Sequence, residues 1–311
     1  MSEARDRLVE AAGRTIAAGS KSFRFASQIF DLKTRERSWL LYAWCRACDD
    51  VTDGQTLGHD ATPPSDPLER IAFLRRSTDA ALAGRPTGIE PFDALAVVAS
   101  ETAIPAYLAH DHLAGFERDA RGWSPQTEDD LLSYCYQVAG AVGVMMAHVM
   151  GVDPKGEDQS ADTFHRAADL GIAFQLANIA RDIVDDARVG RCYLPAEWLA
   201  REGLAPGDLA DPAHRVALAQ FTRRLAELAE AYRRSSKVGA ARLPFRSRWA
   251  VLSAAGIYGE VANRAVALGP RAWDRRISIS KSEKFALVLE AMGEALMPVA
   301  RQGRDGLWTH G

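Results

Sequence analysis

Polar residues between positions 42 and 53 are spaced so that one face of a helix would carry them. They are Tyr42, Arg46, Asp49 (or Asp50) and Asp53, at intervals of three or four residues. Because such positions lie on the same side of a helix, two carboxylates and a guanidinium would share one site. The flanking residues are strongly apolar, which indicates a core helix whose polar face is turned toward a cavity. A solvated helix face is the alternative explanation of the acidic residues.

A second polar stripe occurs further along the chain, in a segment that is otherwise apolar. Its members follow one another at intervals of three or four residues: Gly171, Gln175, Asn178, Asp182 and Asp186. Arg181 lies one position to the side. Burying such charges without partners is costly, so we expect a ligand that compensates them.

The two stripes resemble each other, since each ends in two aspartates four residues apart and each has an arginine beside it. Two facing helices of this kind would clamp divalent cations between them. Carboxylate and amide oxygens without His or Cys favour a hard cation such as Mg²⁺, which is commonly bound together with substrate phosphates. The implied substrate is a diphosphate, whose departing charge the arginines would neutralise.

Two shorter segments are further candidates. Ser20, Lys21 and Ser22 come directly before an apolar helical stretch, where hydroxyls and free amides bind anions, although an ordinary N-cap is the alternative. Their spacing is not that of a nucleotide-binding P-loop. The segment from Tyr134 to Met146 places small residues on one helix face, which either permits close helix packing or lines a channel for a long apolar substrate.

The elements that must position these residues are helices. Apolar residues recur at intervals of three and four along almost the whole chain and alanine is abundant, so we predict an all-α protein. The predicted helices span residues 3–18, 20–30, 33–53, 67–83, 91–103, 105–120, 127–150, 160–187, 195–202, 212–236, 246–268 and 281–301. No fixed-period repeat divides the chain, and we expect residues 1–311 to form a single domain.

Composition excludes several classes of protein. The 38 basic and 41 acidic residues offer no general attraction to nucleic acid. Four cysteines are too few and too unevenly spaced for a disulfide framework, so we expect a reducing compartment and interpret Cys45 and Cys48 as core residues. No segment approaches the ~20 apolar residues that span a bilayer. We therefore expect a cytoplasmic protein that is either soluble or bound only to a membrane surface.

Four motifs of this sequence resemble, in order, those of the phytoene and squalene synthase family, the head-to-head prenyl transferases. They are GSKSF from position 19, YAWCRACDDVTD from position 42, YCYQVAGAVG from position 134 and LGIAFQLANIARDIVDDARVGRCYLP from position 170. The resemblance covers residues 15–295 and is strongest to the bacterial phytoene synthases. The tail after Pro298 contributes little to it.

That resemblance implies the helical class I isoprenoid synthase fold, with a central cavity between the two aspartate-rich helices. It implies Mg²⁺ binding, with Mn²⁺ as an alternative, by Asp49, Asp53, Asn178, Asp182 and Asp186. It implies contacts with diphosphate or substrate by Ser20, Lys21, Ser22, Tyr42, Arg46, Gln175, Arg181, Arg191 and Tyr258. The four aspartates, Tyr42, Arg46 and Arg181 would act in catalysis, and no NADPH is expected.

The implied reaction joins two molecules of geranylgeranyl diphosphate into phytoene, through prephytoene diphosphate and with loss of two diphosphates. It belongs to carotenoid biosynthesis, so downstream carotenoid enzymes are expected partners and nucleic acid is not. The alternative within the family is condensation of farnesyl diphosphate to squalene, dehydrosqualene or hydroxysqualene. A lipid-binding helical protein without catalysis is a further alternative, but both aspartate pairs are intact here.

Two further features concern the apolar substrate. Ser27 lies one helical turn after Phe23, and a small side chain there would leave room for a C20 chain, so Ser27→Phe is expected to shorten the accepted substrate. Because substrate and product are very apolar, we also expect peripheral contact with the inner face of the membrane. The candidate patch is Arg242–Trp249, which is basic and contains Phe245 and Trp249, with an ordinary loop and helix start as the alternative.

Overall fold

A computed structural model describes residues 2–52, 66–156, 158–300 and 302–310, without the side chains of Ser2, Lys21, Ser22 and Asp158. Within these residues the regular elements are helices and no strand is found, which confirms the predicted fold class. The α-helices are α1 (Ser2–Gly19), α2 (Lys21–Ser27), α3 (Leu32–Thr52), α4 (Pro67–Leu82), α5 (Glu90–Thr102), α6 (Ala106–Ala120), α7 (Glu128–Cys135), α8 (Ala141–Val149), α9 (Asp158–Arg188), α10 (Ala196–Arg201), α11 (Arg215–Ala240), α12 (Phe245–Leu268) and α13 (Lys281–Leu296). A π-helix, η1 (Tyr136–Gly140), joins α7 to α8, and short 3₁₀ turns are η2 (Pro206–Asp208), η3 (Pro212–His214) and η4 (Gly269–Arg271).

Four predicted helices differ from the observed elements by an interruption or by three or more residues at an end. The predicted helix 20–30 ends at Ser27, and the predicted helix 212–236 is observed as η3 followed by α11, which ends at Ala240. The predicted helix 127–150 is interrupted by η1, so that its middle turn is wider than an α-helical turn. The predicted helix 281–301 ends at Leu296. Met297 is extended, with ψ of 146°, because the residue before a proline is disfavoured in the α conformation and Pro298 follows.

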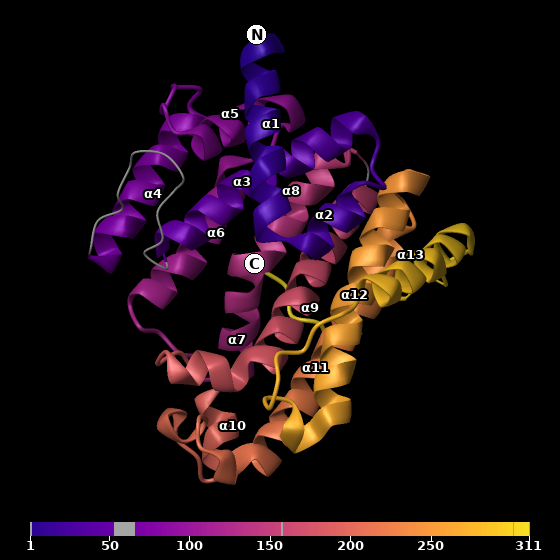
Figure 1. Cartoon of the computed structure of the whole chain (residues 1–311). Coiled ribbons are helices and arrows are strands. Elements are labelled where there is room, and N and C mark those ends of the chain that lie inside the picture. The colour runs from indigo at the N-terminus through magenta and orange to yellow at the C-terminus, as the bar shows by residue number, and fades with distance from the viewer. Residues whose placement is uncertain (1, 53–65, 157, 301, 311) are drawn as a thin grey trace.

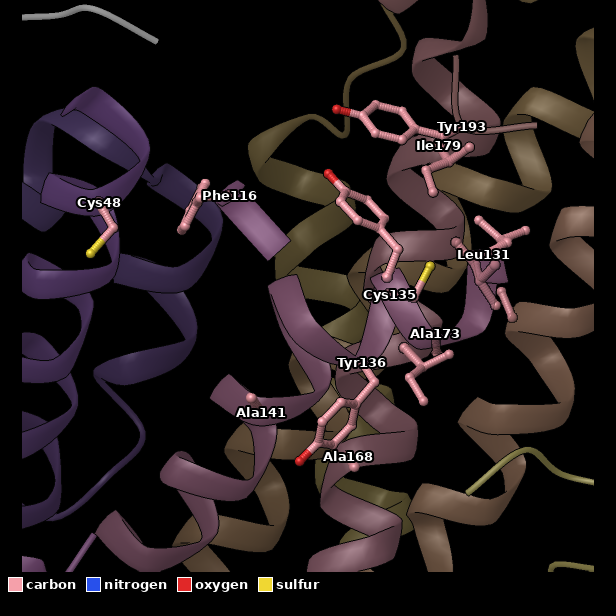
Figure 2. Close-up of a cluster of buried hydrophobic side chains, with 14 of the residues drawn as sticks. Cys48, Phe116, Leu131, Cys135, Tyr136, Ala141, Ala168, Ala173, Ile179 and Tyr193 are labelled. Carbon is pink, nitrogen blue, oxygen red and sulfur yellow. The ribbon is translucent and has the colours of Figure 1, made fainter. Parts of the chain in front are cut away.

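Helix α9 is the central element of the fold, as Figure 1 shows. It has 31 residues and packs against α8, η1, α11 and α12. Figure 2 shows part of the core beside it, including Cys135 and Tyr136 together with Ala168 and Ala173 of α9. The helices come this close because glycine stands where they cross. A Cβ at Gly171 would lie 2.2 Å from the carbonyl oxygen of Ala139.

Helix α3 presents one face to the core and another to a cavity. Its residues Leu40, Trp44, Cys48 and Val51 are fully buried, and α3 packs against α1, α4 and α5. Trp44 donates a hydrogen bond from Nε1 to Thr78 Oγ1 at 3.2 Å. The four cysteines of the chain are free thiols. As predicted, the apolar face of α3 is buried in the core, and its polar residues Tyr42, Arg46 and Asp49 line the cavity.

The segment that follows α13 folds back over α9 and α11. Arg304 forms two hydrogen bonds, of 2.8 and 2.6 Å, with the carboxylate of Asp169, which is fully buried on α9. The backbone N–H of Trp308 donates to Tyr232 Oη on α11 at 3.0 Å. This tail therefore contributes to the core, although its sequence adds little to the family resemblance.

Candidate active site

A cavity of about 820 Å³ lies among the helices and receives both polar stripes. Along α9 its walls extend from Thr163 to Asp186, about 35 Å of helix. The predicted site residues that line it are Ser20, Tyr42, Arg46, Asp49, Gln175, Asn178, Arg181, Asp182, Asp186, Arg191 and Tyr258. Asp53 and the side chains of Lys21 and Ser22 lie outside the described residues. The polar faces of α3 and α9 thus meet across one cavity.

On α3, Arg46 is held by two carboxylates of its own helix. Its Nη1 lies 3.1 Å from Asp49 Oδ2, and its Nη2 lies 2.5 Å from Asp50 Oδ1. Burial opposes the charged form, but the charges of Asp50 and Asp49 outweigh it and raise the pKa of Arg46. Tyr42 stacks on Phe23 with ring centroids 5.5 Å apart, and burial raises the pKa of Tyr42 to about 12. The site therefore offers a fixed cation and a neutral phenol on this side.

Ser20 has a local structural role as well as a place on the cavity wall. Its Oγ accepts a hydrogen bond from the backbone N–H of Phe23 at 3.2 Å and so caps α2. The preceding residue, Gly19, makes room for Tyr42, because a Cβ at position 19 would lie 2.4 Å from the tyrosine hydroxyl. The ordinary N-cap is therefore the arrangement that the structure shows for the Ser20 side chain.

On α9, Arg181 and Asp182 form a two-pronged ion pair. Arg181 Nε donates to Asp182 Oδ1 at 2.7 Å, and Nη2 donates to Oδ2. This hydrogen bonding raises the pKa of Arg181 despite its burial. Burial raises the pKa of Asp186 to about 7, and the nearby charge of Asp182 adds to the shift, whereas Arg191 opposes it. Negative charge at this end of the cavity is thus only partly compensated.

Aromatic and aliphatic side chains form the remaining walls. Tyr258 stacks on Phe174 with ring centroids 4.1 Å apart, and burial raises the pKa of Tyr258. The other apolar residues on the wall include Phe23, Phe30, Leu41, Phe116, Val138, Val142, Met146, Ile179 and Ile257. The segment from Tyr134 to Met146 therefore serves both predicted purposes, close helix packing and lining of the cavity. Gly143 crosses α9 closely, and its neighbours Val142 and Met146 line the cavity.

Asp119, Tyr134 and Tyr193 form a hydrogen-bonded cluster on the cavity wall. Asp119 accepts hydrogen bonds from the hydroxyls of Tyr134 at 2.8 Å and Tyr193 at 3.0 Å. The two rings stack with centroids 4.9 Å apart. Arg276, in the segment between α12 and α13, also lines the cavity. Both tyrosines lie in quoted motifs, but Asp119 and Arg276 belong to no such pattern, and only the folded chain brings them here.

The structure corrects the expectation for Ser27, because this residue is not on the cavity wall. Its hydroxyl donates to the carbonyl of Arg24 at 2.9 Å and accepts from Trp39 Nε1 at 3.0 Å. Ala26 and Phe30 of the same segment line the cavity instead. A larger side chain at position 27 would first displace Trp39 and would reach the cavity only indirectly.

Comparison with known proteins identifies the family. The family model described as squalene/phytoene synthase matches residues 16–283. The chain belongs to the squalene/phytoene synthase family. It is 47% identical to a 15-cis-phytoene synthase of Pantoea ananas over 291 residues, which cover 93% of this chain and 92% of that protein. It is 50% identical to a 15-cis-phytoene synthase of Enterobacter agglomerans over 285 residues, which cover 89% of this chain and 92% of that protein.

The same family appears among solved structures. A dehydrosqualene synthase in complex with a ligand superposes with a TM-score of 0.81 at 27% identity, covering 94% of this chain and 97% of that one. The squalene synthase HpnC of Alicyclobacillus acidocaldarius superposes with a TM-score of 0.72 at 20% identity, covering 85% of this chain and 95% of that one, and shares the fold. The predicted helical isoprenoid synthase fold and the expectation of an enzyme of this family are confirmed.

The donor set in the cavity fits a hard divalent cation. Asp49, Asp182 and Asp186 supply carboxylate oxygens and Asn178 an amide oxygen. The described residues contain no group of three or more His, Cys, Asp or Glu side chains close enough to hold a metal by themselves. Phosphate oxygens of a substrate would complete the coordination, as is usual for Mg²⁺. Burial is the main cause of the raised pKa of Asp186, and the nearby charge of Asp182 adds to it; a bound cation would oppose both effects by stabilising the charged carboxylate.

Proposed function

We propose that this protein is a phytoene synthase, which joins two molecules of geranylgeranyl diphosphate head to head and releases two diphosphates. The observation that carries this proposal is the cavity, where two aspartate-bearing helix faces meet walls that are largely apolar. A diphosphate with a long hydrocarbon chain needs both kinds of surface. Relatives of 45–50% identity that are named phytoene synthases support the choice of product.

The diphosphate would lie at the aspartate end of the cavity. The donors for Mg²⁺, or for Mn²⁺ in its place, are Asp49, Asp53, Asn178, Asp182 and Asp186. When bound, the metal supplies positive charge that stabilises the departing diphosphate. Arg46 and Arg181 remain protonated among the carboxylates and add to the positive potential there. Further contacts with diphosphate or substrate are assigned to Ser20, Lys21, Ser22, Tyr42, Gln175, Arg191 and Tyr258.

The chemistry has two stages. Loss of diphosphate from one substrate leaves an allylic cation, which the double bond of the second substrate attacks. Loss of a proton from the resulting cation closes the cyclopropane ring of prephytoene diphosphate. Loss of the second diphosphate, rearrangement and release of a proton then give phytoene. The reaction needs no reductant, because it ends by deprotonation. Aromatic walls such as Phe174 and Tyr258 exclude water and offer π faces to the cations.

Asp119 would act as a positioning residue in this scheme. It accepts hydrogen bonds from both Tyr134 and Tyr193, which fixes the orientation of two neutral phenols on the cavity wall. Burial raises the pKa of both tyrosines, so they remain hydrogen-bond donors at neutral pH. Because each phenol donates its one O–H to Asp119, the cluster would act by holding the cavity wall near Asp186 in place.

The second candidate is a C15 enzyme that makes squalene, dehydrosqualene or hydroxysqualene from farnesyl diphosphate. It is favoured by the structural likeness to a dehydrosqualene synthase. Both candidates use the same polar residues and differ in the chain length of the substrate. Dehydrosqualene would form by the same final deprotonation, whereas squalene would also need a hydride donor and hydroxysqualene a water molecule.

Peripheral membrane contact, at the inner face of the membrane, is a further part of the proposal, because the substrate and product are very apolar. No helix in the described ranges is long and apolar enough to cross a bilayer. In the candidate patch Arg242–Trp249, Phe245 is 44% exposed, but Trp249 is half-buried and donates from Nε1 to the carbonyl of Val288 at 2.8 Å. Phe245, and not Trp249, is therefore the residue of this patch that would enter a membrane surface. Enzymes that use the hydrocarbon product would be its neighbours there.

The decisive experiment is incubation of the purified protein with Mg²⁺ and either geranylgeranyl or farnesyl diphosphate, without NADPH, and mass analysis of the product. We expect phytoene from the C20 substrate. Asp49→Asn and Asp182→Asn should each lower the rate by ~100-fold or more, because several kcal/mol of charge stabilisation are removed. Asp185→Asn is the matched control, since Asp185 is exposed and pairs with Arg188 at 2.9 Å on the same helix.

The other outcomes are equally informative. A C30 product from farnesyl diphosphate alone would support the C15 alternative. Absence of product from both substrates, with a folded protein, would support the non-catalytic lipid-binding alternative.

A further inference from the structure

Helix α13 carries large apolar side chains on the side that faces solvent. Figure 1 shows this helix at the edge of the molecule, where it packs against α12. Phe285 is 57% exposed, Leu289 is 46% exposed and, at the end of the helix, Leu296 is 70% exposed. These residues are four and seven positions apart, so they lie on one face of the helix. Met297, directly after α13, is exposed as well, and we call these four residues the outer face of α13.

The opposite face of α13 is also apolar and packs toward the catalytic cavity. Its buried residues are Val288, Ala291 and Ala295. They belong to buried clusters that include Ala240 of α11 and Ala250 of α12, both of which line the cavity. A surface helix usually presents polar residues opposite its buried face. The outer face of α13 departs from that pattern, and exposed apolar patches of this kind mark contact surfaces.

The start of α12 lies beside the end of the outer face. Arg248 of α12 donates hydrogen bonds to the carbonyl oxygens of Glu294 and Met297, at 3.2 and 2.6 Å. Phe245, which is exposed, comes three residues before Arg248 on the same helix. The outer face therefore adjoins the exposed part of the patch Arg242–Trp249.

Positive charge is present at both ends of the outer face. Lys281, the first residue of α13, is exposed, as is Arg246 at the start of α12. Within the described ranges neither residue forms an ion pair. Glu290 is the exposed carboxylate of α13, whereas its other carboxylates, Glu283 and Glu294, have ion-pair partners within the protein. An apolar face that ends in cations matches an anionic lipid surface, which offers both an apolar layer and phosphate groups.

A second copy of the chain fits the outer face less well. Two-fold symmetry would bring two outer faces together either antiparallel or parallel. In the antiparallel pair the cation at the start of one helix would approach the cation at the end of the other, and in the parallel pair each cation would approach its own equivalent. Like charges meet in both arrangements, which opposes association.

We propose that the outer face of α13 binds to the surface of a membrane that contains anionic lipids. Its apolar side chains, with Phe245 beside them, enter the boundary between headgroups and acyl chains. Lys281 and Arg246 pair with headgroup phosphates at the two ends. The inference rests on the membrane contact proposed above and names the surface that makes it. Docking in this orientation brings the apolar part of the catalytic cavity, behind α13, next to the lipid.

The test is flotation of the full-length protein with vesicles of phosphatidylcholine and phosphatidylglycerol. Leu289→Gln combined with Leu296→Gln should weaken binding by ~10-fold or more, because two apolar side chains no longer enter the interface. The matched control is Leu68→Gln combined with Val216→Gln, which removes two exposed apolar side chains from α4 and α11. All four positions are exposed, so neither double variant should disturb the core.

The charge at the start of the outer face is tested separately. Lys281→Glu should weaken binding to the same vesicles by ~10-fold, with a much smaller effect on vesicles of phosphatidylcholine alone. This variant should fold, because a carboxylate in the first turn of a helix is stabilising. Lys155→Glu, at an exposed position after α8, is the control and should bind as wild type does.

Three outcomes would overturn the docking surface. They are no vesicle binding by wild type, equal binding by wild type and the Leu289/Leu296 double variant, and a wild-type dimer in light scattering that this double variant converts to a monomer. The last outcome would assign the face to a second copy. Product formation in detergent should be unchanged in the double variant and tests the reaction alone. Vesicle binding without any product would therefore contradict the proposed function and not the docking surface.

Discussion

Gly143 of α8 lies so close to Ala167 of α9 that a Cβ at position 143 would be 2.2 Å from the carbonyl oxygen of Ala167. Side chains do not approach a backbone oxygen at that distance, so any larger residue must push the two helices apart. Val142 and Met146, on either side of Gly143, line the catalytic cavity. The same segment of α8 therefore forms both the close crossing with α9 and part of the cavity wall.

Gly143→Ala is expected to destabilise the protein by ~1–3 kcal/mol, because it overpacks a tight crossing. It should also lower the catalytic rate, since the cavity wall moves. Urea unfolding measures the first effect. Gly293→Ala is the matched control, because nothing lies within 4 Å of a Cβ there, and it should be neutral or stabilising. Equal stability of the two variants would contradict the proposed role of the crossing.

Tyr134→Phe should reduce the rate of product formation by ~10–100-fold, because a hydrogen bond to the charged Asp119 is lost while the ring stack with Tyr193 remains. Steady-state rates with the C20 substrate measure this effect. Tyr136→Phe is the control, since Tyr136 donates to Asp111 at 3.1 Å, away from the cavity wall. The positioning role of Asp119 fails if both variants retain full activity.

Arg304→Ala is expected to destabilise the fold by ~3–5 kcal/mol, because it leaves the buried carboxylate of Asp169 without its cation. The hydroxyl of Ser235 still donates to Asp169 at 2.6 Å and does not supply the missing charge. Thermal and chemical unfolding measure the loss. Arg275→Ala, at an exposed position, should leave stability unchanged. A negligible effect of Arg304→Ala would show that the C-terminal segment is dispensable.

His112 gives the protein a specific dependence on pH. Burial lowers the pKa of His112 to about 4 and outweighs its contacts with the backbone of Gln137 and Val138. Below pH ~6.5 the unfolded chain binds a proton that the folded chain does not bind, so stability falls as pH decreases from ~6.5 to about 4 and then levels off. The full loss is about 3 kcal/mol.

The His112→Asn variant tests this dependence, because asparagine does not titrate in that range. Unfolding free energies of wild type and variant at several pH values between 4 and 7 should show a flatter profile for the variant. Parallel profiles would assign the pH dependence to other groups.

The helices and the two polar stripes were predictable because they depend on local order in the sequence. A period of 3.6 residues fixes which side chains share a helix face. Arg46 and Asp49 therefore lie on the same face of α3, whichever helices pack around it. Asp182 and Asp186 follow the same rule on α9. Matching polar faces on otherwise apolar helices then predicted a shared cavity, and the family motifs supplied its chemistry.

Other features depend on contacts between distant segments and have no local signature. In the sequence, nothing distinguishes Asp119 from other acidic residues of α6. Its role depends on hydrogen bonds from Tyr134 and Tyr193, which belong to two other segments. Ser27 shows the opposite case, because its position in the sequence suggested the cavity whereas Trp39 holds its hydroxyl elsewhere.

The sequence by itself determined the helical class, the family and the polar residues of the candidate site, because periodicity and motif order are properties of neighbouring residues. Only the tertiary structure decided how close the helices cross, where the tail packs and which side chains complete the cavity. The physical reason is that these features follow from sterics and electrostatics between segments far apart in the chain, such as Gly143 against Ala167 and Arg304 against Asp169. No local pattern encodes such a pairing before the chain has folded.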